Sequence, residues 1–419
     1  MIRTVLVIGW VWPEPQSSAA GHHMVSLLRS FRAQQWQVVF ACCAEPTPLS
    51  FSLASIGVSQ QRIDVNDSDF DQWVARLQPD LVLFDRYLME EQFGWRVASA
   101  APNALRILDT EDLQCLRFAR QQAHKAGLPL AEAELTNDIS LRELASIWRC
   151  DLSLIISRAE HDLLTEHFGV SDKLLHYLPL QLQAGTELAP MPAAETLGYQ
   201  DRTGFVTIGN FRHAPNWDSV LYLRELWPQV KQQLPQAEIH IYGAYMPPKA
   251  RQLHNVKLGF HVHGWVEDAR AAVAQARVCV APLRFGAGQK GKLLLAMCAG
   301  TPSVTTLVGA ESMVEQGWPG RVADGDKHLV QAMVEMHQDE SAWQKAQRHG
   351  YNWLQQLQAY NGAAALIQRL SDLFSRLPSH RQANFIGAML RHHHHKSTEY
   401  FSRWIETKNR LAQGDDDTP

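Results

Sequence analysis

The sequence has no apolar run of about 18 residues, the length that a membrane-spanning helix needs. The apolar run at 4–9 is too short for the core of a signal peptide and fits the first strand of a sheet. Basic residues are not in excess, because the formal net charge is −4, and this disfavours a nucleic-acid-binding surface. With 46% hydrophobic and 20% charged residues, the composition is that of an ordinary globular protein.

Cysteine is also scarce, and none of the six cysteines belongs to a CxxC pair. Several lie inside apolar segments, so we expect buried free thiols and a reducing, cytoplasmic location, with peripheral membrane contact left open. A catalytic cysteine is not favoured, because no base and orienting group accompany any of them.

At 419 residues the chain exceeds what one hydrophobic core supports, so two domains are expected. Short apolar runs alternate with helical patterns, which predicts an α/β fold of doubly wound parallel sheets. In the first half the expected strands are 4–9, 37–42, 81–85, 105–109 and 152–157, with helices at 19–34, 113–125 and 131–148. In the second half they are 204–209, 238–243, 256–262 and 278–281, with helices at 217–233 and 266–275.

The periodic pattern is interrupted at 186–202 by a stretch rich in Pro, Ala, Gly and Glu, which is typical of a linker. We therefore expect a Rossmann-like domain at 1–185, a second Rossmann-like domain at 203–375 and a helical tail at 376–419. The acidic end, Gly414 to Pro419, is expected to be disordered.

The most informative segment runs from Pro282 to Met313 and reads PLRFGAGQKGKLLLAMCAGTPSVTTLVGAESM. Gly286 and Gly288 allow the backbone to approach a ligand closely, because glycine has no Cβ. Lys290 and Lys292 lie where a helix is expected to begin. Cations beside a helix N-terminus form a site for phosphate or diphosphate. The segment therefore predicts a diphosphate site at the ends of the strands.

This segment resembles the nucleotide-sugar-binding signature of retaining GT-B glycosyltransferases of the group 1, family 4 type. The matching positions are Pro282, Leu283, Arg284, Gly286, Gly288, Lys290, Lys292, Ala296, Met297, Gly300, Pro302, Gly309 and Glu311. One position departs from the signature, since Leu295 stands where the family has an acidic residue that accepts hydrogen bonds from the donor ribose.

The resemblance implies two Rossmann-like domains that face a cleft, followed by C-terminal helices. It also implies a hexosyltransferase that moves a sugar from a nucleoside-diphosphate sugar to an acceptor with retention. No metal or other cofactor is expected, and the acceptor is left open among glycan, lipid, protein and small molecule. Lys290, Lys292 and Glu311 would act at the reacting groups.

Further donor-binding residues are expected from the same resemblance. They are Arg284, Gly286, Gly288, Asn210, Arg212, Gly264 and Trp265. Trp265 either stacks on the nucleobase or is an ordinary core tryptophan. Asn216, in the loop that holds Arg212, either faces the donor or caps the following helix.

The acceptor side is expected in the first domain. Its candidates are Gly21, His22, Asp85, Asp109, Glu111 and Asp112. The run Asp109 to Gln114 resembles a D-T-x-D-L-H run of the family, but Gln114 replaces its histidine, so no acid–base role is transferred. Asp112 is alternatively a helix cap. Ser157 and Glu160 match an S-x-x-E pattern, which we interpret as a capping box.

The tail contains four consecutive histidines, His392 to His395, which point in different directions on a helix and so do not form one metal site. Basic residues around them leave an anionic acceptor, a membrane surface and another chain open as partners. The oligomeric state is not predicted.

Two alternative functions remain open on the same fold. A nucleotide-sugar 2-epimerase would need acids and histidines around the sugar and no acceptor site. A non-catalytic nucleotide-sugar-binding or partner protein is the other alternative, and Leu295 is the reason to keep it.

Overall fold

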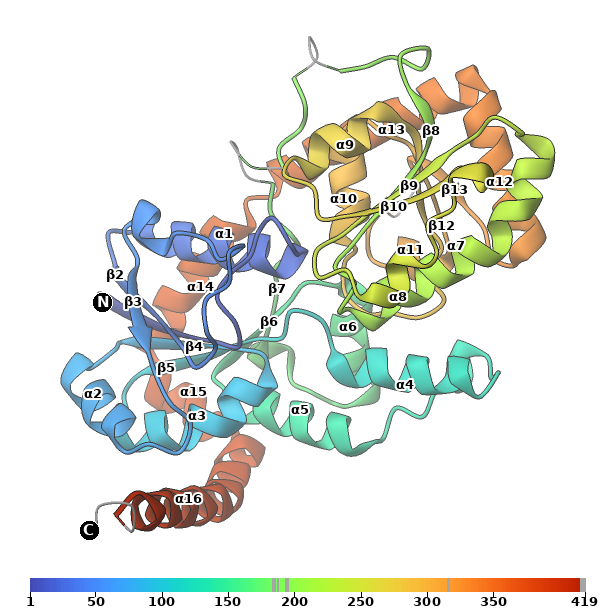
Figure 1. The fold of residues 1–419 in the computed structure, drawn as a ribbon. Helices are drawn as coiled ribbons and strands as arrows, with labels where there is room; N and C mark the ends of the chain where they lie inside the picture. The colour runs from blue at the N-terminus through green and yellow to red at the C-terminus, as the bar shows by residue number, and fades with distance from the viewer. Residues whose placement is uncertain (183–185, 187, 193–195, 315–316, 415–419) are drawn as a thin grey trace.

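The computed structural model describes residues 1–182, 186, 188–192, 196–314 and 317–414, and Figure 1 shows its two parallel sheets with helices on both faces of each. The first sheet has the strand order β3-β2-β1-β4-β5-β6-β7. Its strands are β1 (Thr4–Gly9), β2 (Gln37–Cys42), β3 (Ser59–Arg62), β4 (Leu81–Asp85), β5 (Leu105–Asp109), β6 (Leu152–Ile155) and β7 (Leu175–Tyr177). Its helices are α1 (Ala19–Ala33), α2 (Asp69–Leu77), α3 (Tyr87–Ala100), α4 (Gln114–Lys125), α5 (Asp138–Arg149) and α6 (Arg158–Asp162).

The second sheet has the order β10-β9-β8-β11-β12-β13. Its strands are β8 (Thr203–Ile208), β9 (Ile239–Tyr242), β10 (Phe260–Gly264), β11 (Ala276–Ala281), β12 (Ser303–Thr305) and β13 (Gly320–Val322). Its helices are α7 (Ala214–Gln233), α8 (Pro248–Arg251), α9 (Ala269–Gln275), α10 (Gly291–Cys298), α11 (Leu307–Ala310), α12 (Asp326–Gln338) and α13 (Glu340–Ala359). The predicted fold class, two Rossmann-like parallel-sheet domains, is confirmed.

Both faces of each sheet are buried, which explains the nearly continuous apolar runs of the strands. In β1, Leu6 and Ile8 pack into one core of the first domain, whereas Val5 and Val7 pack into the core on the opposite face. This alternation follows from the period of two along a strand.

Three expected helix starts were wrong: the helix expected from residue 217 begins at Ala214, and caps explain the other two. The helix expected from residue 131 begins at Asp138, where the Asn137 side chain accepts hydrogen bonds from the backbone N–H groups of Ile139 and Ser140. The helix expected from Val266 begins at Ala269, and the Asp268 side chain accepts from the N–H of Ala271.

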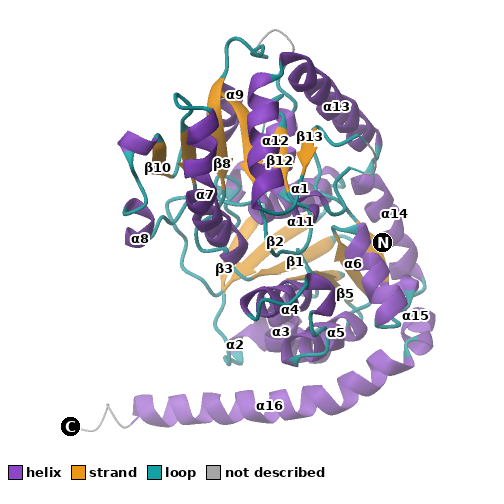
Figure 2. Ribbon diagram, turned by 90° about the vertical axis from the view of Figure 1, so that its right-hand side faces the viewer, coloured by secondary structure: helices purple, strands orange, loops and turns teal. Residues whose placement is uncertain are grey.

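The C-terminal helices return to the first domain, as Figures 1 and 2 show. They are α14 (Gly362–Ser375), α15 (Leu377–Ala383) and α16 (Phe385–Gly414). α14 packs against α1, and Leu366, Leu370 and Leu373 are buried in a core of the first domain. α14 was expected to belong to the second domain at 203–375. It packs on the first domain instead, because its apolar stripe covers the first sheet. The expected linker at 186–202 and the acidic end lie partly outside the described residues.

We predict that Leu370→Ala lowers the free energy of unfolding by about 2–5 kcal/mol, because it leaves a cavity where α14 meets the first domain. Leu141→Ala is the matched control, since Leu141 is 62% exposed, and its effect should stay within about 0.5 kcal/mol. Urea denaturation measures both changes. Equal effects of the two variants would contradict the docking of α14.

Candidate active site

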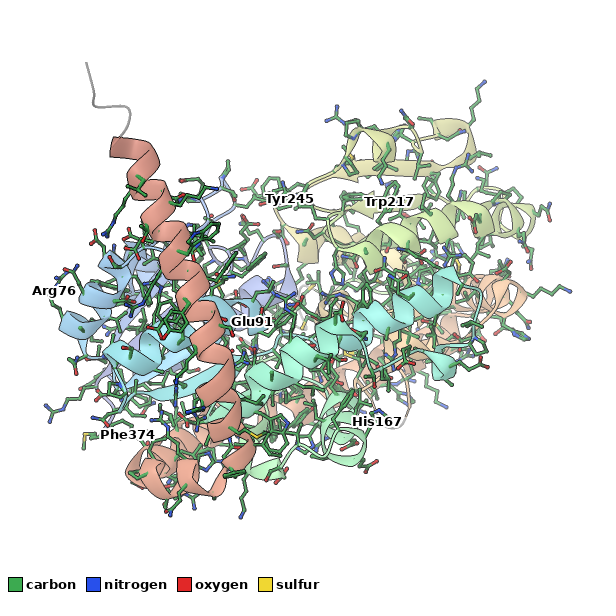
Figure 3. The ribbon with its side chains drawn as sticks, turned by 90° about the horizontal axis from the view of Figure 1, so that it is seen from below. Arg76, Glu91, His167, Trp217, Tyr245 and Phe374 are labelled. Carbon is green, nitrogen blue, oxygen red and sulfur yellow. The ribbon has the colours of Figure 1, made fainter. Side chains whose placement is uncertain are left out.

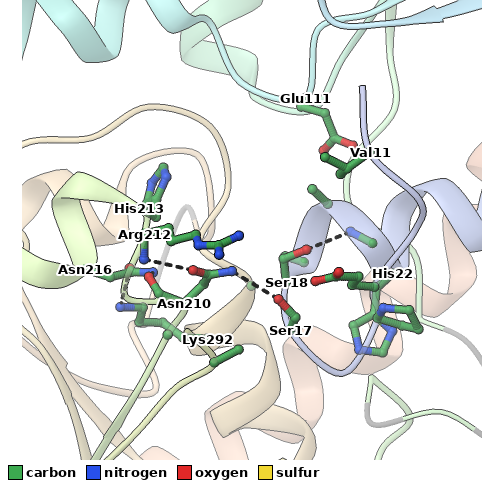
Figure 4. A pocket seen from close by; sticks show the side chains of 18 of the residues that line it. Val11, Ser17, Ser18, His22, Glu111, Asn210, Arg212, His213, Asn216 and Lys292 are labelled. Carbon is green, nitrogen blue, oxygen red and sulfur yellow. Dashed lines mark hydrogen bonds between the residues drawn. The ribbon is translucent and has the colours of Figure 1, made fainter. Parts of the chain in front are cut away.

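A cleft of about 640 Å³ lies between the domains, at the carboxyl ends of strands from both sheets, where parallel sheets place ligands. Figure 4 shows part of its lining, with Ser17 and His22 from the first domain and Arg212 and Lys292 from the second. Of the residues expected from the sequence, it is lined by Gly21, His22, Asp85, Glu111, Asp112, Asn210, Arg212, Trp265, Gly286, Lys290 and Lys292. Asp109, Gly264, Arg284, Gly288 and Glu311 lie outside the lining.

The loop between β11 and α10 forms the floor of the cleft. Gly288 has a φ of 65°, and a Cβ at this position would lie 2.8 Å from the Cβ of Asp112 in the first domain. Only glycine satisfies both the left-handed backbone and this close approach. Lys290 immediately precedes the first residue of α10, Gly291, and both line the cleft, where the first N–H groups of the helix have no partner within the helix. The Nζ of Lys290 donates a hydrogen bond to the carbonyl of Gly288.

Two lysines give this region its charge, and of these Lys290 is buried and Lys292 is half-buried. Lys290 is only 8% exposed, and burial lowers its pKa, although the nearby carboxylates of Glu311 and Glu160 oppose the shift. Burial also lowers the pKa of Lys292 to about 8. The Nζ of Lys292 donates a hydrogen bond to Asn216 Oδ1 at 2.8 Å. An anion bound here would raise the pKa of both lysines, since an opposite charge favours the ionised state.

The loop between β8 and α7 forms one wall, and its internal hydrogen bonds hold it in place. Asn210 donates to Ser17 Oγ of the first domain at 3.0 Å and accepts from the N–H of Arg212 at 2.9 Å (Figure 4). Asn216 donates to the carbonyl of Asn210. The alternative that Asn216 caps the helix was wrong, because α7 begins at Ala214.

Arg212 and His213 occupy different environments in this wall. The Arg212 guanidinium lies 3.8 Å from the centroid of the Tyr245 ring, a cation–π contact. Burial, and then the positive charge of Arg117, lowers the pKa of His213 to about 4, so the imidazole is neutral. Sequence reasoning missed His213 because a histidine just before a helix carries no distinctive signal.

A group of buried carboxylates and one imidazole lies at the ends of β4 and β5. Burial alone would lower the pKa of His23, but Asp109 and the nearby Glu111 and Asp85 outweigh it and raise the pKa to about 9. His23 Nε2 lies 3.5 Å from Asp109 Oδ1. His22 lines the cleft, whereas His23 lies beneath it together with Asp109.

Glu111 and Asp85 are the members of this group that line the cleft, and Glu111 has an unusual backbone. Its φ is 62°, a left-handed conformation that is uncommon for a residue with a side chain and that clusters at functional sites. Burial, reinforced by the negative charge of Asp109, raises its pKa to about 8. The neighbouring Asp112 forms an ion pair with Arg117, and the alternative that it caps α4 was wrong, since Leu113 occupies that position without a side-chain bond.

Glu160 connects the two domains directly. Ser157 accepts a hydrogen bond from the N–H of Glu160, as the capping pattern predicts, but the Glu160 side chain does not complete the box. Its Oε1 accepts from the N–H of Gly288 at 2.7 Å and from the N–H of Leu113 at 3.0 Å. Burial, and then the charge of Asp112, raises its pKa to about 8. Sequence reasoning missed this contact between the domains because the S-x-x-E pattern indicates only a capping role for Glu160.

Arg120 makes a second connection across the domains. Its guanidinium forms a bidentate ion pair with Glu311, at 2.7 and 2.8 Å, and donates to the carbonyl of Gly286 at 2.9 Å. Hydrogen bonds from Arg120 hold the pKa of Glu311 below its ordinary value although burial raises it. Arg284 is likewise occupied outside the cleft, by Asp218 at 2.7 and 2.9 Å.

Residues 202–339 match the family model described as glycosyl transferases group 1. The second domain is a glycosyltransferase domain. The enzyme class of the protein is accordingly that of the glycosyltransferases, and the match covers the loops after β8 and β11 that line the cleft. No curated protein sequence matches the chain at a significant level.

Several solved structures have a fold similar to that of both domains. Sucrose-phosphate synthase from Thermosynechococcus elongatus has 16% identity and a TM-score of 0.68, covering 89% of this chain and 100% of that one. The Anabaena protein Alr3699/HepE in complex with UDP and glucose has 13% identity and a TM-score of 0.64, covering 90% and 100%. The lipopolysaccharide outer core galactosyltransferase WaaB has 13% identity and a TM-score of 0.56, covering 88% and 99%. Both sheets of this glycosyltransferase thus form a GT-B fold.

We predict that Glu111→Gln changes how the stability of the glycosyltransferase depends on pH. The folded protein keeps the Glu111 proton to about pH 8, whereas the unfolded chain releases it near 4.5, so the folded state binds more protons between these values. Stability then falls as pH rises through this window, and removing the group should flatten the fall. Melting temperatures across the window, by circular dichroism, measure it.

The exposed carboxylate Glu132 provides the control for this measurement, and the curve of Glu132→Gln should run parallel to that of the native protein. If the Glu111→Gln curve is also parallel to the native curve, the buried, protonated state of Glu111 is contradicted.

Proposed function

We propose that the cleft binds a nucleoside-diphosphate sugar and transfers its sugar, with retention and without a metal, to an acceptor held by the first domain. The observation that carries this proposal is the pair of lysines that line the cleft beside the first turn of α10, Lys290 buried and Lys292 half-buried, inside a domain that matches the group 1 glycosyltransferases. A diphosphate satisfies both the lysines and the free helical N–H groups.

The lysines would act mainly in the transition state. Breaking the bond between sugar and phosphate develops negative charge on the leaving phosphate. Fixed cations in a buried site stabilise that charge more than the ground state, which lowers the barrier. Because Lys290 and Lys292 already supply positive charge at this place, the transfer would need no metal ion.

The other donor groups differ in how well they fit the expected roles. Trp265 is 43% exposed and lines the cleft, which favours stacking on a nucleobase over a core position. Arg212 and Asn210 lie on the wall that would face the phosphates. Glu311 would act on the loop through Arg120 rather than contact the sugar, since the two side chains form a bidentate pair in this structure.

The acceptor would approach from the first domain. Glu111, Asp85 and His22 line that side of the cleft, and their side chains can form hydrogen bonds with acceptor hydroxyl groups, with the protonated Glu111 as a donor. Retention follows from the family resemblance of the signature. The leaving phosphate, next to Lys290, would take the acceptor proton, so no side-chain nucleophile is needed.

Leu295 supports an alternative function. It lines the cleft at the position where the family has a carboxylate for the ribose, and leucine offers no hydrogen bond. A non-catalytic nucleotide-sugar-binding protein would have the same cleft. The acidic cluster of Asp85, Asp109 and Glu111 with His23 would also suit a 2-epimerase, which would release no free sugar and need no acceptor.

A thermal-shift screen of the full chain against UDP, GDP and ADP sugars tests donor binding. The neighbour solved with UDP and glucose makes UDP-glucose the first donor to test. A donor at about 100 times its Kd should add about 2.7 kcal/mol of stability. No shift with any nucleotide sugar would contradict the proposal. Analysis of the products then distinguishes the three functions. Free sugar indicates a transferase, a C2 epimer indicates an epimerase, and no product indicates a non-catalytic protein.

We predict that Lys290→Met and Lys292→Met each lower the rate of donor hydrolysis or transfer by about 10²–10³-fold, because each removes one cation from the leaving phosphate. The long apolar side chain of methionine keeps the packing. Lys257→Met, on the exposed surface of the same domain, is the matched control and should have the native rate. Native rates in both cleft variants would contradict the roles of the lysines.

A further inference from the structure

The long helix α16 packs on the first domain with its polar side, which is the reverse of the usual arrangement. Its Ser402 Oγ accepts a hydrogen bond from Arg96 of α3 at 3.0 Å and donates to Asn66 at 2.7 Å. Glu406 accepts from the N–H of Ser68 at 3.2 Å. Polar contacts therefore fix this end of α16 on the domain.

The outward side of the same helix is aromatic and aliphatic. Tyr400 is 69% exposed, Trp404 is 58% exposed and Leu411 is 67% exposed, and Met389 is exposed as well. These residues share one side, because steps of four, seven and eleven residues return to the same face of an α-helix. Phe401 stacks beside Trp404 and widens the stripe.

The charges of α16 are also divided between the two sides. Glu399 and Glu406 are each neutralised by an arginine one turn along the helix, Arg403 and Arg410, at 2.7 and 2.8 Å. Lys396 and Lys408 remain on the exposed side, and neither has an acidic partner among the described side chains. The outer face is therefore positive in a protein whose formal net charge is −4.

Figures 2 and 3 place α16 on the outside of the first domain, away from the second domain, and no other described element covers its outer side. An exposed helix with Trp, Tyr and Leu between lysines fits the boundary between lipid headgroups and acyl chains, where amphipathic aromatic rings and cations are favoured. No helix among the described residues is long and apolar enough to cross a membrane.

We propose that the outer face of α16 binds the surface of an anionic phospholipid membrane and lies along it. A second copy of the chain is a less suitable partner for this face. In a pair of such helices, the lysines beside the stripe would lie close to the lysines of the other copy, and lysine is depleted in the core of protein interfaces. Anionic headgroups instead complement Lys396 and Lys408.

Co-sedimentation of the full chain with vesicles tests the proposal. Vesicles of phosphatidylcholine alone are compared with vesicles that also contain phosphatidylglycerol. We expect binding to the anionic vesicles only, released by added salt because surface charges are screened over about 10 Å at 0.1 M. Tyr400→Ser with Trp404→Ser should abolish binding, and Lys396→Glu with Lys408→Glu should weaken it more than tenfold.

The matched control combines Leu141→Ser and Val256→Ser, two exposed aliphatic residues outside α16, and should bind as the native protein does. All variants change exposed side chains, so we expect unchanged melting temperatures and unchanged donor hydrolysis. The variant with Lys396→Glu and Lys408→Glu tests the surface without removing an aromatic ring. Failure of the native chain to bind anionic vesicles, or native binding by the lysine variant, would overturn the proposal. A dimer in light scattering that both variants dissociate would identify a second copy instead and would also overturn it.

Discussion

The buried carboxylate of Glu160 holds the two domains around the cleft. It accepts the N–H of Leu113 in one domain and of Gly288 in the other, so the start of α4 and the lysine loop are fixed to the same oxygen. Arg120 fixes the loop a second time, through Glu311 and the carbonyl of Gly286. These bonds hold Gly288 close to Asp112 of the first domain. The loop that carries the lysines therefore lies beside the acceptor side of the cleft.

The electrostatics of the cleft follow from burial on both sides. On the second domain, burial weakens the ionisation of two lysines, and on the first domain burial raises the pKa of Glu111. A diphosphate would favour the charged lysines and leave the protonated Glu111 as a hydrogen-bond donor. The ligand itself would therefore complete the charge distribution of the cleft.

Much of this could be predicted from the sequence where local rules apply. The strands and the lysine loop follow from apolar runs, glycines and a helix start, and these local signals predicted the two sheets. The predictions that were wrong concern residues whose contacts join distant segments of the chain. Asn216 and Asp112 have residue types suited to caps, yet Asn216 bonds Lys292 and Asp112 pairs with Arg117, contacts that depend on the fold. The polar docking of α16 is of the same kind, since Asn66 and Arg96 are far away in the sequence.

A nucleoside diphosphate that binds to the backbone and lysines at the start of α10 would protect the amides of this loop from exchange. Hydrogen–deuterium exchange of the full chain, with and without UDP, GDP or ADP, measures this directly at the amides of residues 286–293. We expect at least one of the nucleotides to slow exchange in this segment while exchange in α16 stays unchanged. Exchange in the segment that is unaltered by every nucleotide, or slowed only elsewhere in the chain, would contradict it.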